Sequence, residues 1–206
     1  MNKTLSWSLM FLAASLVGLY ALASALLPDL RTEFVANMVQ TSATGSVLHF
    51  LGGAIVIIVG AFQFHSGFRN KYTNLHRWFG RIYVGGIFIG GLAALNLAFY
   101  STGGVVAHFG FGLLAICWLG TTFLAYRHIR ARNIPLHQQW MIRSYALTLA
   151  AVTLRLYIPL FQVAGVSFEE SYPAIAWLCW VPNLLIAEWW LVPRVSRQMP
   201  GRQAVA

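Results

Sequence analysis

The chain alternates between long apolar stretches and short polar breaks over almost its whole length. A helix needs about 20 consecutive apolar residues to cross a bilayer, and six stretches reach that length. The pattern therefore predicts an all-α membrane protein with about six transmembrane helices in a single transmembrane domain, residues 1–206. We place the spans at residues 5–27, 45–64, 75–99, 105–125, 138–161 and 173–192.

The first span has a second interpretation. Lys3, the apolar run and the segment Ala21-Leu22-Ala23 resemble a signal peptide with a small-residue cleavage site. The run is longer than the roughly 7–15 residues of a signal-peptide core, which favours a retained helix. Cleavage would leave the orientation of the other five spans unchanged.

A short amphipathic segment follows the first span. Leu30, Phe34 and Met38 recur every four residues after Pro28, with Asp29 as the expected N-cap. This spacing predicts a short interfacial helix over about residues 30–40. It would act either as a lid over an outer site or as a connector.

Composition excludes a soluble domain. Hydrophobic residues make up 58% of the chain and charged residues 9%, whereas soluble domains carry about 25% charged residues. Cys117 and Cys179 lie inside apolar stretches, so they predict no disulfide framework.

The positive charge is distributed as a topology signal. The formal net charge is +9, but 12 of the 14 Lys and Arg residues lie at the chain ends or in the breaks after spans two and four. Lys and Arg are retained on the cytoplasmic side, so both termini are expected to be cytoplasmic. The expected partner is therefore the lipid bilayer of a bacterial inner membrane, and nucleic acid is not expected.

Spans two and three resemble spans four and five. The segment His49-Phe50-Leu51-Gly52 matches His108-Phe109-Gly110, and both stretches reach a second histidine followed by Trp, at His76 and His137. Two hairpins of the same orientation suggest a parallel repeat. We expect spans two to five to form a central four-helix bundle built from two repeated helical hairpins.

The histidines suggest haem. Under a pseudo-twofold axis His49 pairs with His108 near the outer face, and His76 pairs with His137 at the inner face. Facing imidazoles in a helical bundle suit the axial positions of haem iron, so two b haems are expected. The same histidines could instead bridge helices by hydrogen bonds. Zinc or copper could use the same imidazoles, but no Cys, Asp or Glu is placed to complete a compact set of metal ligands.

Other residues complete the expected cofactor sites. Gly52 and Gly80 leave room for a macrocycle, or else for close helix packing. Arg77, Arg81 and Arg143 are candidate partners of the inner propionates. Arg155 is the only basic residue deep in a span, and we expect it to pair with a buried anion in the outer half, with Glu188 as a weaker partner. The candidate lining of a quinone or haem pocket, equally suited to bonding between helices, is Gln63, Tyr83, Tyr145 and Asn183.

Two resemblances add to these patterns. The segments His76-Arg77-Trp78-Phe79-Gly80-Arg81-Ile82-Tyr83 and Trp140-Met141-Ile142-Arg143-Ser144-Tyr145, with Trp180-Val181-Pro182-Asn183, resemble bacterial membrane proteins grouped as domain of unknown function 2306. That resemblance spans residues 45–192 and implies a multi-span fold. The arrangement of spans and histidines is also similar to the di-haem cytochrome b-561 group, which implies electron transfer across a membrane.

Transmembrane electron transfer by a b-type, di-haem cytochrome is therefore the function expected first. The protein would be a membrane oxidoreductase linked to a quinol or another small reductant, or to a respiratory-chain partner. Iron would carry the chemistry, so no side chain is assigned as an acid or base. The alternatives are a transporter or permease for a small solute or metal ion, and a non-catalytic assembly partner of a respiratory complex.

Overall fold

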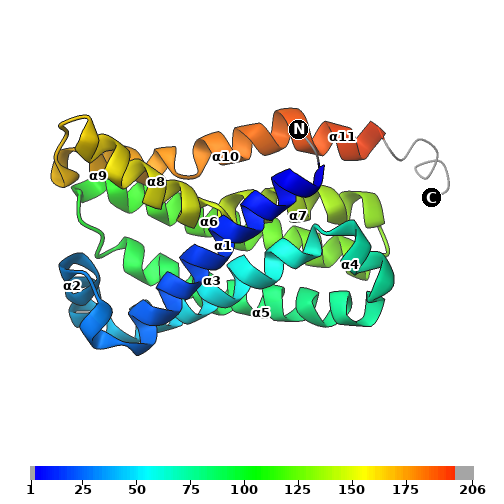
Figure 1. Cartoon of the computed structure of the whole chain (residues 1–206), viewed down its shortest axis with the longest axis horizontal. Coiled ribbons are helices and arrows are strands. Elements are labelled where there is room, and N and C mark those ends of the chain that lie inside the picture. The colour runs from blue at the N-terminus through cyan, green and yellow to red at the C-terminus, as the bar shows by residue number, and fades with distance from the viewer. Residues whose placement is uncertain (1–2, 198–206) are drawn as a thin grey trace.

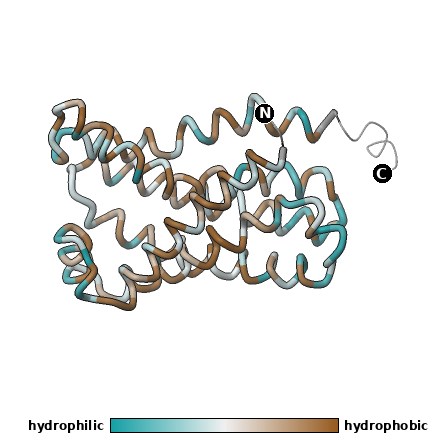
Figure 2. The backbone as a smooth tube through the Cα atoms, viewed as in Figure 1, coloured by the Kyte–Doolittle hydropathy of each residue, from teal (hydrophilic) through white to brown (hydrophobic). Residues whose placement is uncertain are grey.

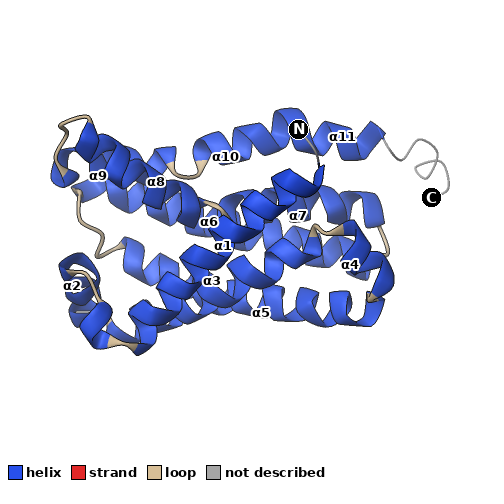
Figure 3. Cartoon of the chain, in the orientation of Figure 1, coloured by secondary structure: helices blue, strands red, loops and turns tan. Residues whose placement is uncertain are grey.

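The computed structural model describes residues 3–197, which form helices joined by short turns, with no strand among them (Figures 1 and 3). Six helical segments are long and apolar enough to cross a membrane, as the hydropathy pattern predicted. They are α1 (Lys3–Leu26), α3 (Ala43–Gln63), α5 (Thr73–Ala98), α6 (Gly104–Arg130), α7 with α8 (Ile134–Thr148 and Ala150–Val163), and α9 to α11 (Phe168–Leu178, Val181–Ile186 and Val192–Arg197).

Short elements lie between and within these segments. They are the 3₁₀ turn η1 (Pro28–Leu30), α2 (Glu33–Thr41), α4 (Ser66–Lys71) and the π-helical turn η2 (Ala187–Leu191), which joins α10 to α11. The expected N-cap of the short helix is wrong: Asp29 lies in η1, and Thr32 caps α2 by accepting a hydrogen bond from the Val35 amide. The sixth segment begins five residues earlier than predicted, because Ser167 and Glu170 form a capping box.

Four helices form the central bundle. α3 packs on α5, α5 on α6, α6 on α7, and α7 returns to α3. α3 and α6 therefore lie diagonally across the bundle, and so do α5 and α7. α1 covers α3, while α8 and α9 pack on each other beside the bundle.

Glycines bring α3 and α5 together. A Cβ placed on Gly52 would lie 3.0 Å from both the carbonyl oxygen of Gly86 and the Cα of Gly90. Membrane helices use such small residues to let their backbones approach. This contact fixes the register of the hairpin, in which Gly60 lies against Tyr83.

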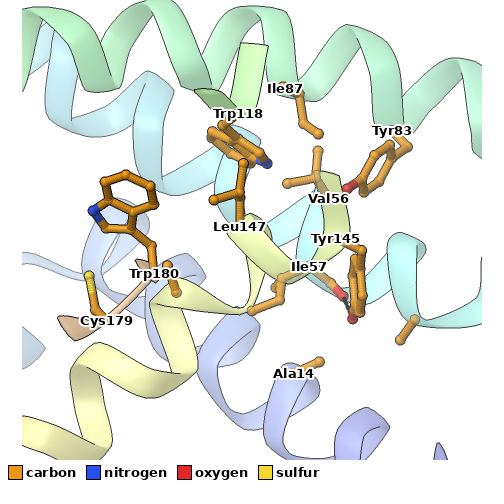
Figure 4. Close-up of a cluster of buried hydrophobic side chains, with 12 residues drawn as sticks. Ala14, Val56, Ile57, Tyr83, Ile87, Trp118, Tyr145, Leu147, Cys179 and Trp180 are labelled. Carbon is orange, nitrogen blue, oxygen red and sulfur yellow. Dashed lines mark hydrogen bonds between the residues drawn. The ribbon is translucent and has the colours of Figure 1, made fainter. Parts of the chain in front are cut away.

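Large side chains fill the middle of the bundle. Tyr83, Ile87, Val56 and Ile57 are buried, and Trp118 and Tyr145 approach them from α6 and α7 (Figure 4). The Tyr145 hydroxyl donates a hydrogen bond to the Ile57 carbonyl oxygen at 2.9 Å. The bundle is thus packed at mid-depth, and any internal ligand must bind nearer one of its ends.

The fifth and sixth segments are both interrupted. α7 ends at Thr148 and α8 begins at Ala150, while a turn at Cys179 and Trp180 separates α9 from α10. The Asn183 amide connects the two interruptions, because its Nδ2 donates to the Ala146 carbonyl oxygen at 3.3 Å and the Thr153 hydroxyl at 2.9 Å. A neighbouring helix thus satisfies backbone and side-chain groups near the break.

Polar residues gather at the two ends of the molecule, and the middle is mostly apolar (Figure 2). One end contains α4, the α6–α7 turn and the last turns of α11, and we call it the basic end; α2 and the α5–α6 and α8–α9 turns form the opposite end (Figure 1). Arg69, Lys71 and Arg130 lie at the basic end. Arg202, which the charge pattern assigned to this side, lies outside the described residues.

Candidate functional site

His137 is oriented by the backbone of the preceding helix. It lies in the first turn of α7, which Asn133 caps by accepting a hydrogen bond from the Leu136 amide. Its Nδ1 is 2.9 Å from the Ala125 carbonyl oxygen. Because a carbonyl only accepts, Nδ1 carries the proton and Nε2 keeps its lone pair. Histidine ligands of metals are typically held in this way.

His76 occupies the matching position in α5. Its Nδ1 is buried without a hydrogen-bond partner, and in residues 3–197 the only other such side-chain atom is Nε2 of Gln63. Both lie at the basic end, Gln63 at the last turn of α3 and His76 in the first turn of α5. His137 lies within electrostatic range of His76. Buried polar atoms are rarely left unpaired, so this part of the bundle is suited to a ligand.

A hydrogen-bond network lies about two turns beyond His76 and His137, toward the middle of the bundle. Tyr83 is seven residues, or about two turns, after His76, and Ser144 is equally far after His137. The hydroxyls of Tyr83 and Ser144 lie 2.9 Å apart. Thr122 reaches Ser144 at 2.7 Å, and Thr148 reaches Tyr83 at 3.0 Å. The faces of α5 and α7 that carry the histidines therefore face each other.

The other histidine pair is not joined. His49 Nδ1 lies 3.1 Å from the Gly90 carbonyl oxygen, which leaves its Nε2 free. His108 instead uses Nε2, which lies 2.8 Å from the Ser101 carbonyl oxygen in the α5–α6 turn. The two equivalent positions of the predicted repeat thus make different bonds. As it stands, the opposite end does not offer two free Nε2 atoms to one haem.

The remaining histidines have local contacts. His65 caps α4 by accepting a hydrogen bond from the Phe68 amide at 2.9 Å, and its ring packs edge-on against Trp7. With Phe68 and Trp7 it lines a hollow between α1, α3 and α4. His128, near the end of α6, lies within electrostatic range of His137.

The arginines at the basic end differ in their availability. Arg143 forms a two-pronged ion pair with Glu188, at 2.5 and 2.9 Å, and stacks over the Trp140 ring. Glu188 is therefore the partner of Arg143 and not of Arg155. Arg81 is exposed over the Trp78 ring, and Arg77 is exposed within range of His76.

The two candidate glycines have different surroundings. Gly52 is occupied by the α3–α5 contact, which favours the helix-packing interpretation of this residue. Gly80 lies one turn after His76, and a Cβ placed there would meet no heavy atom within 4 Å. Open space therefore lies at Gly80, one turn after His76.

Arg155 lies on α8 in the half of the molecule toward the opposite end. Its Nη1 donates to the Ala151 carbonyl oxygen at 2.8 Å, and its guanidinium stacks 4.9 Å over the Tyr20 ring of α1. Tyr172 of α9 and His49 of α3 lie within electrostatic range. The pattern of apolar and polar residues indicated Arg155, but it carried no signal for the two tyrosines, because aromatic residues inside spans are usually packing residues.

Among the side chains of the described region, no three His, Cys, Asp or Glu residues gather closely enough to hold a metal ion. Of the proposed pocket-lining residues, Tyr83, Tyr145 and Asn183 bond within or between helices, and only Gln63 keeps an unpaired buried donor.

Comparison with known proteins identifies the family. No curated protein and no solved structure matches the chain. One family model covers residues 46–191, which include most of α3, all of α5, α6 and α7, and both histidine pairs. The chain therefore belongs to the family described as "Predicted membrane protein (DUF2306)".

Proposed function

We propose that this protein binds haem between His76 and His137 and carries electrons in the bacterial inner membrane as a b-type cytochrome-like protein. The observation that carries the proposal is the unpaired His76 Nδ1, which is buried in range of His137. A second unpaired buried donor, Nε2 of Gln63, lies at the same end of the bundle. The open space at Gly80 supports the proposal.

Each residue has a definite role in this proposal. His76 and His137 would hold the iron, and the Ala125 carbonyl oxygen fixes the ring orientation of His137. Arg77 is free to meet a propionate, whereas Arg143 is already neutralised by Glu188. Haem bound by these residues would supply one-electron redox chemistry. Burial and the neighbouring arginines tune how readily it does so.

Transfer across the whole membrane requires a second site. A haem between His49 and His108 requires His108 to release the Ser101 carbonyl oxygen. A quinol bound at the basic end is the other source of electrons, in which case one haem is sufficient but electrons do not cross the whole membrane. The basic end is proposed to be cytoplasmic with both termini, because Lys and Arg are retained on that side.

Absorption spectroscopy of the purified protein tests the proposal. A bis-histidine haem gives a sharp Soret band that shifts on reduction with dithionite. The protein for this measurement should be expressed with excess haem precursor. A colourless protein under those conditions would reject the cytochrome function and favour the transporter described next.

A small-solute transporter is the second candidate. The interruptions of the fifth and sixth segments and the Asn183 contacts between them support it, because transporters bind substrates where membrane helices are broken. Solute uptake by proteoliposomes tests this function. Proteoliposomes that contain the colourless wild-type protein should be compared with proteoliposomes that contain an Asn183→Leu variant.

A further inference from the structure

Arg155 is a cation inside a candidate membrane span without a protein anion. It lies eight residues before the end of α8, or about 12 Å along the helix. Its contacts are the Ala151 carbonyl oxygen and the face of the Tyr20 ring. A carbonyl and a ring face leave most of the five guanidinium N–H donors unused.

Every carboxylate side chain of the chain can be accounted for. The five Asp and Glu residues all lie within the described region, whose only ion pair joins Arg143 to Glu188. Glu170 accepts hydrogen bonds from Ser167 in the α9 capping box. The other three are exposed, at Asp29, Glu33 and Glu169. None is within ion-pair distance of Arg155, although charges at membrane depth are usually paired.

Further groups surround the same place. His49 lies within electrostatic range of Arg155, and its Nδ1 is committed to the Gly90 carbonyl oxygen, so its Nε2 is available to a ligand. Tyr172 also lies within electrostatic range of Arg155. Phe34 of α2 packs edge-on against Tyr172, with ring centroids 5.5 Å apart, and against Phe168 at 5.3 Å. α2 thus reaches from its docking site on α3 to α9.

We propose that Arg155 anchors an oxyanion-binding site beneath α2, with His49 and Tyr172 within range of its charge. The guanidinium fork matches the two oxygens of a carboxylate or phosphate group. The group belongs either to a small free anion or to the headgroup of an anionic lipid. The proposed oxyanion site is independent of a haem at the basic end, because neither His76 nor His137 belongs to it.

Thermal unfolding of an Arg155→Met variant and the wild type tests the proposal. Methionine keeps the apolar stem and removes the charge, so the variant should be at least as stable as the wild type when no oxyanion is present. Arg81→Met, an exposed arginine at the basic end, is the matched control. Inorganic phosphate and acetate, each against chloride at equal ionic strength, are the free probes. Nanodiscs of phosphatidylcholine with and without phosphatidylglycerol are the lipid probe.

The expected result is a rise of about 5–10 °C in the wild-type Tm at roughly a hundredfold excess of probe over Kd. The rise should persist in Arg81→Met and vanish in Arg155→Met. A response to phosphate or acetate identifies a free anion, and a response to phosphatidylglycerol alone identifies a lipid headgroup. Native mass spectrometry of the washed wild type detects an anion that is already bound. If no probe distinguishes the wild type from Arg155→Met and no bound anion is found, the proposal is wrong.

Discussion

The hydroxyl of Tyr83 lies 2.9 Å from the hydroxyl of Ser144, inside the bundle and about two turns beyond His76 and His137. This contact and the Tyr83–Thr148 contact join α5 and α7, two helices that lie diagonally across the bundle. They set the rotation of α5 and α7, and so they turn both histidines toward the same interior space.

Removing the Tyr83 hydroxyl should destabilise the bundle. Tyr83→Phe leaves the Ser144 and Thr148 hydroxyls with one partner fewer in a fully buried place, at a cost of about 1–3 kcal/mol. Thermal or denaturant unfolding in detergent measures the loss. Tyr157→Phe, on the part-buried face of α8, is the control. Equal stability of Tyr83→Phe and the wild type would show that the network contributes nothing to folding.

Two adjacent glycines should respond oppositely to alanine. Gly52→Ala places a Cβ 3.0 Å from backbone atoms of Gly86 and Gly90, which cannot move aside without separating the helices. Overpacking of this kind costs about 1–3 kcal/mol. Gly53→Ala meets nothing within 4 Å and should be neutral or stabilising by up to about 1 kcal/mol. The two unfolding free energies, measured side by side, test the α3–α5 contact. If Gly53→Ala is the more damaging change, the hairpin register is wrong.

The orientation proposed for the membrane is open to a direct test. Reporter fusions after Lys71, in the basic end, and after Glu170, in the opposite end, should report cytoplasmic and external locations respectively. A fusion after Arg194 is the control, since it lies at the basic end with Lys71. Fusions after Lys71 and Glu170 that report one common side would overturn the six-span topology.

The sequence was sufficient for the helices but not for the bonds of individual histidines. Apolar length alone predicts the spans, because a membrane requires it. His49 and His108 look equivalent in sequence, yet one bonds through Nδ1 and the other through Nε2. That difference depends on helix rotation and on a carbonyl in a turn, and neither leaves a trace in residue type.

The partners of Glu188 and Arg155 could be identified only from the three-dimensional structure. Glu188 was expected to lie nearer the inner face than Arg155. It pairs with Arg143 of α7, which is closer to the basic end than Arg155 of α8. Tyr20, the ring beneath Arg155, lies 135 residues away along the chain. Only packing of α1 against α8 brings these two together.

Haem content of single and double histidine variants tests the central proposal most directly. The pyridine haemochrome assay counts haem per protein in the wild type, His76→Ala, His137→Ala and the double variant, with His65→Ala as the control because His65 caps α4. If His76 and His137 hold one iron, each single variant should lose the same haem, and the double variant should lose no more. His65→Ala should keep the wild-type content. Additive losses from His76→Ala and His137→Ala, or a wild type without haem, would contradict the account.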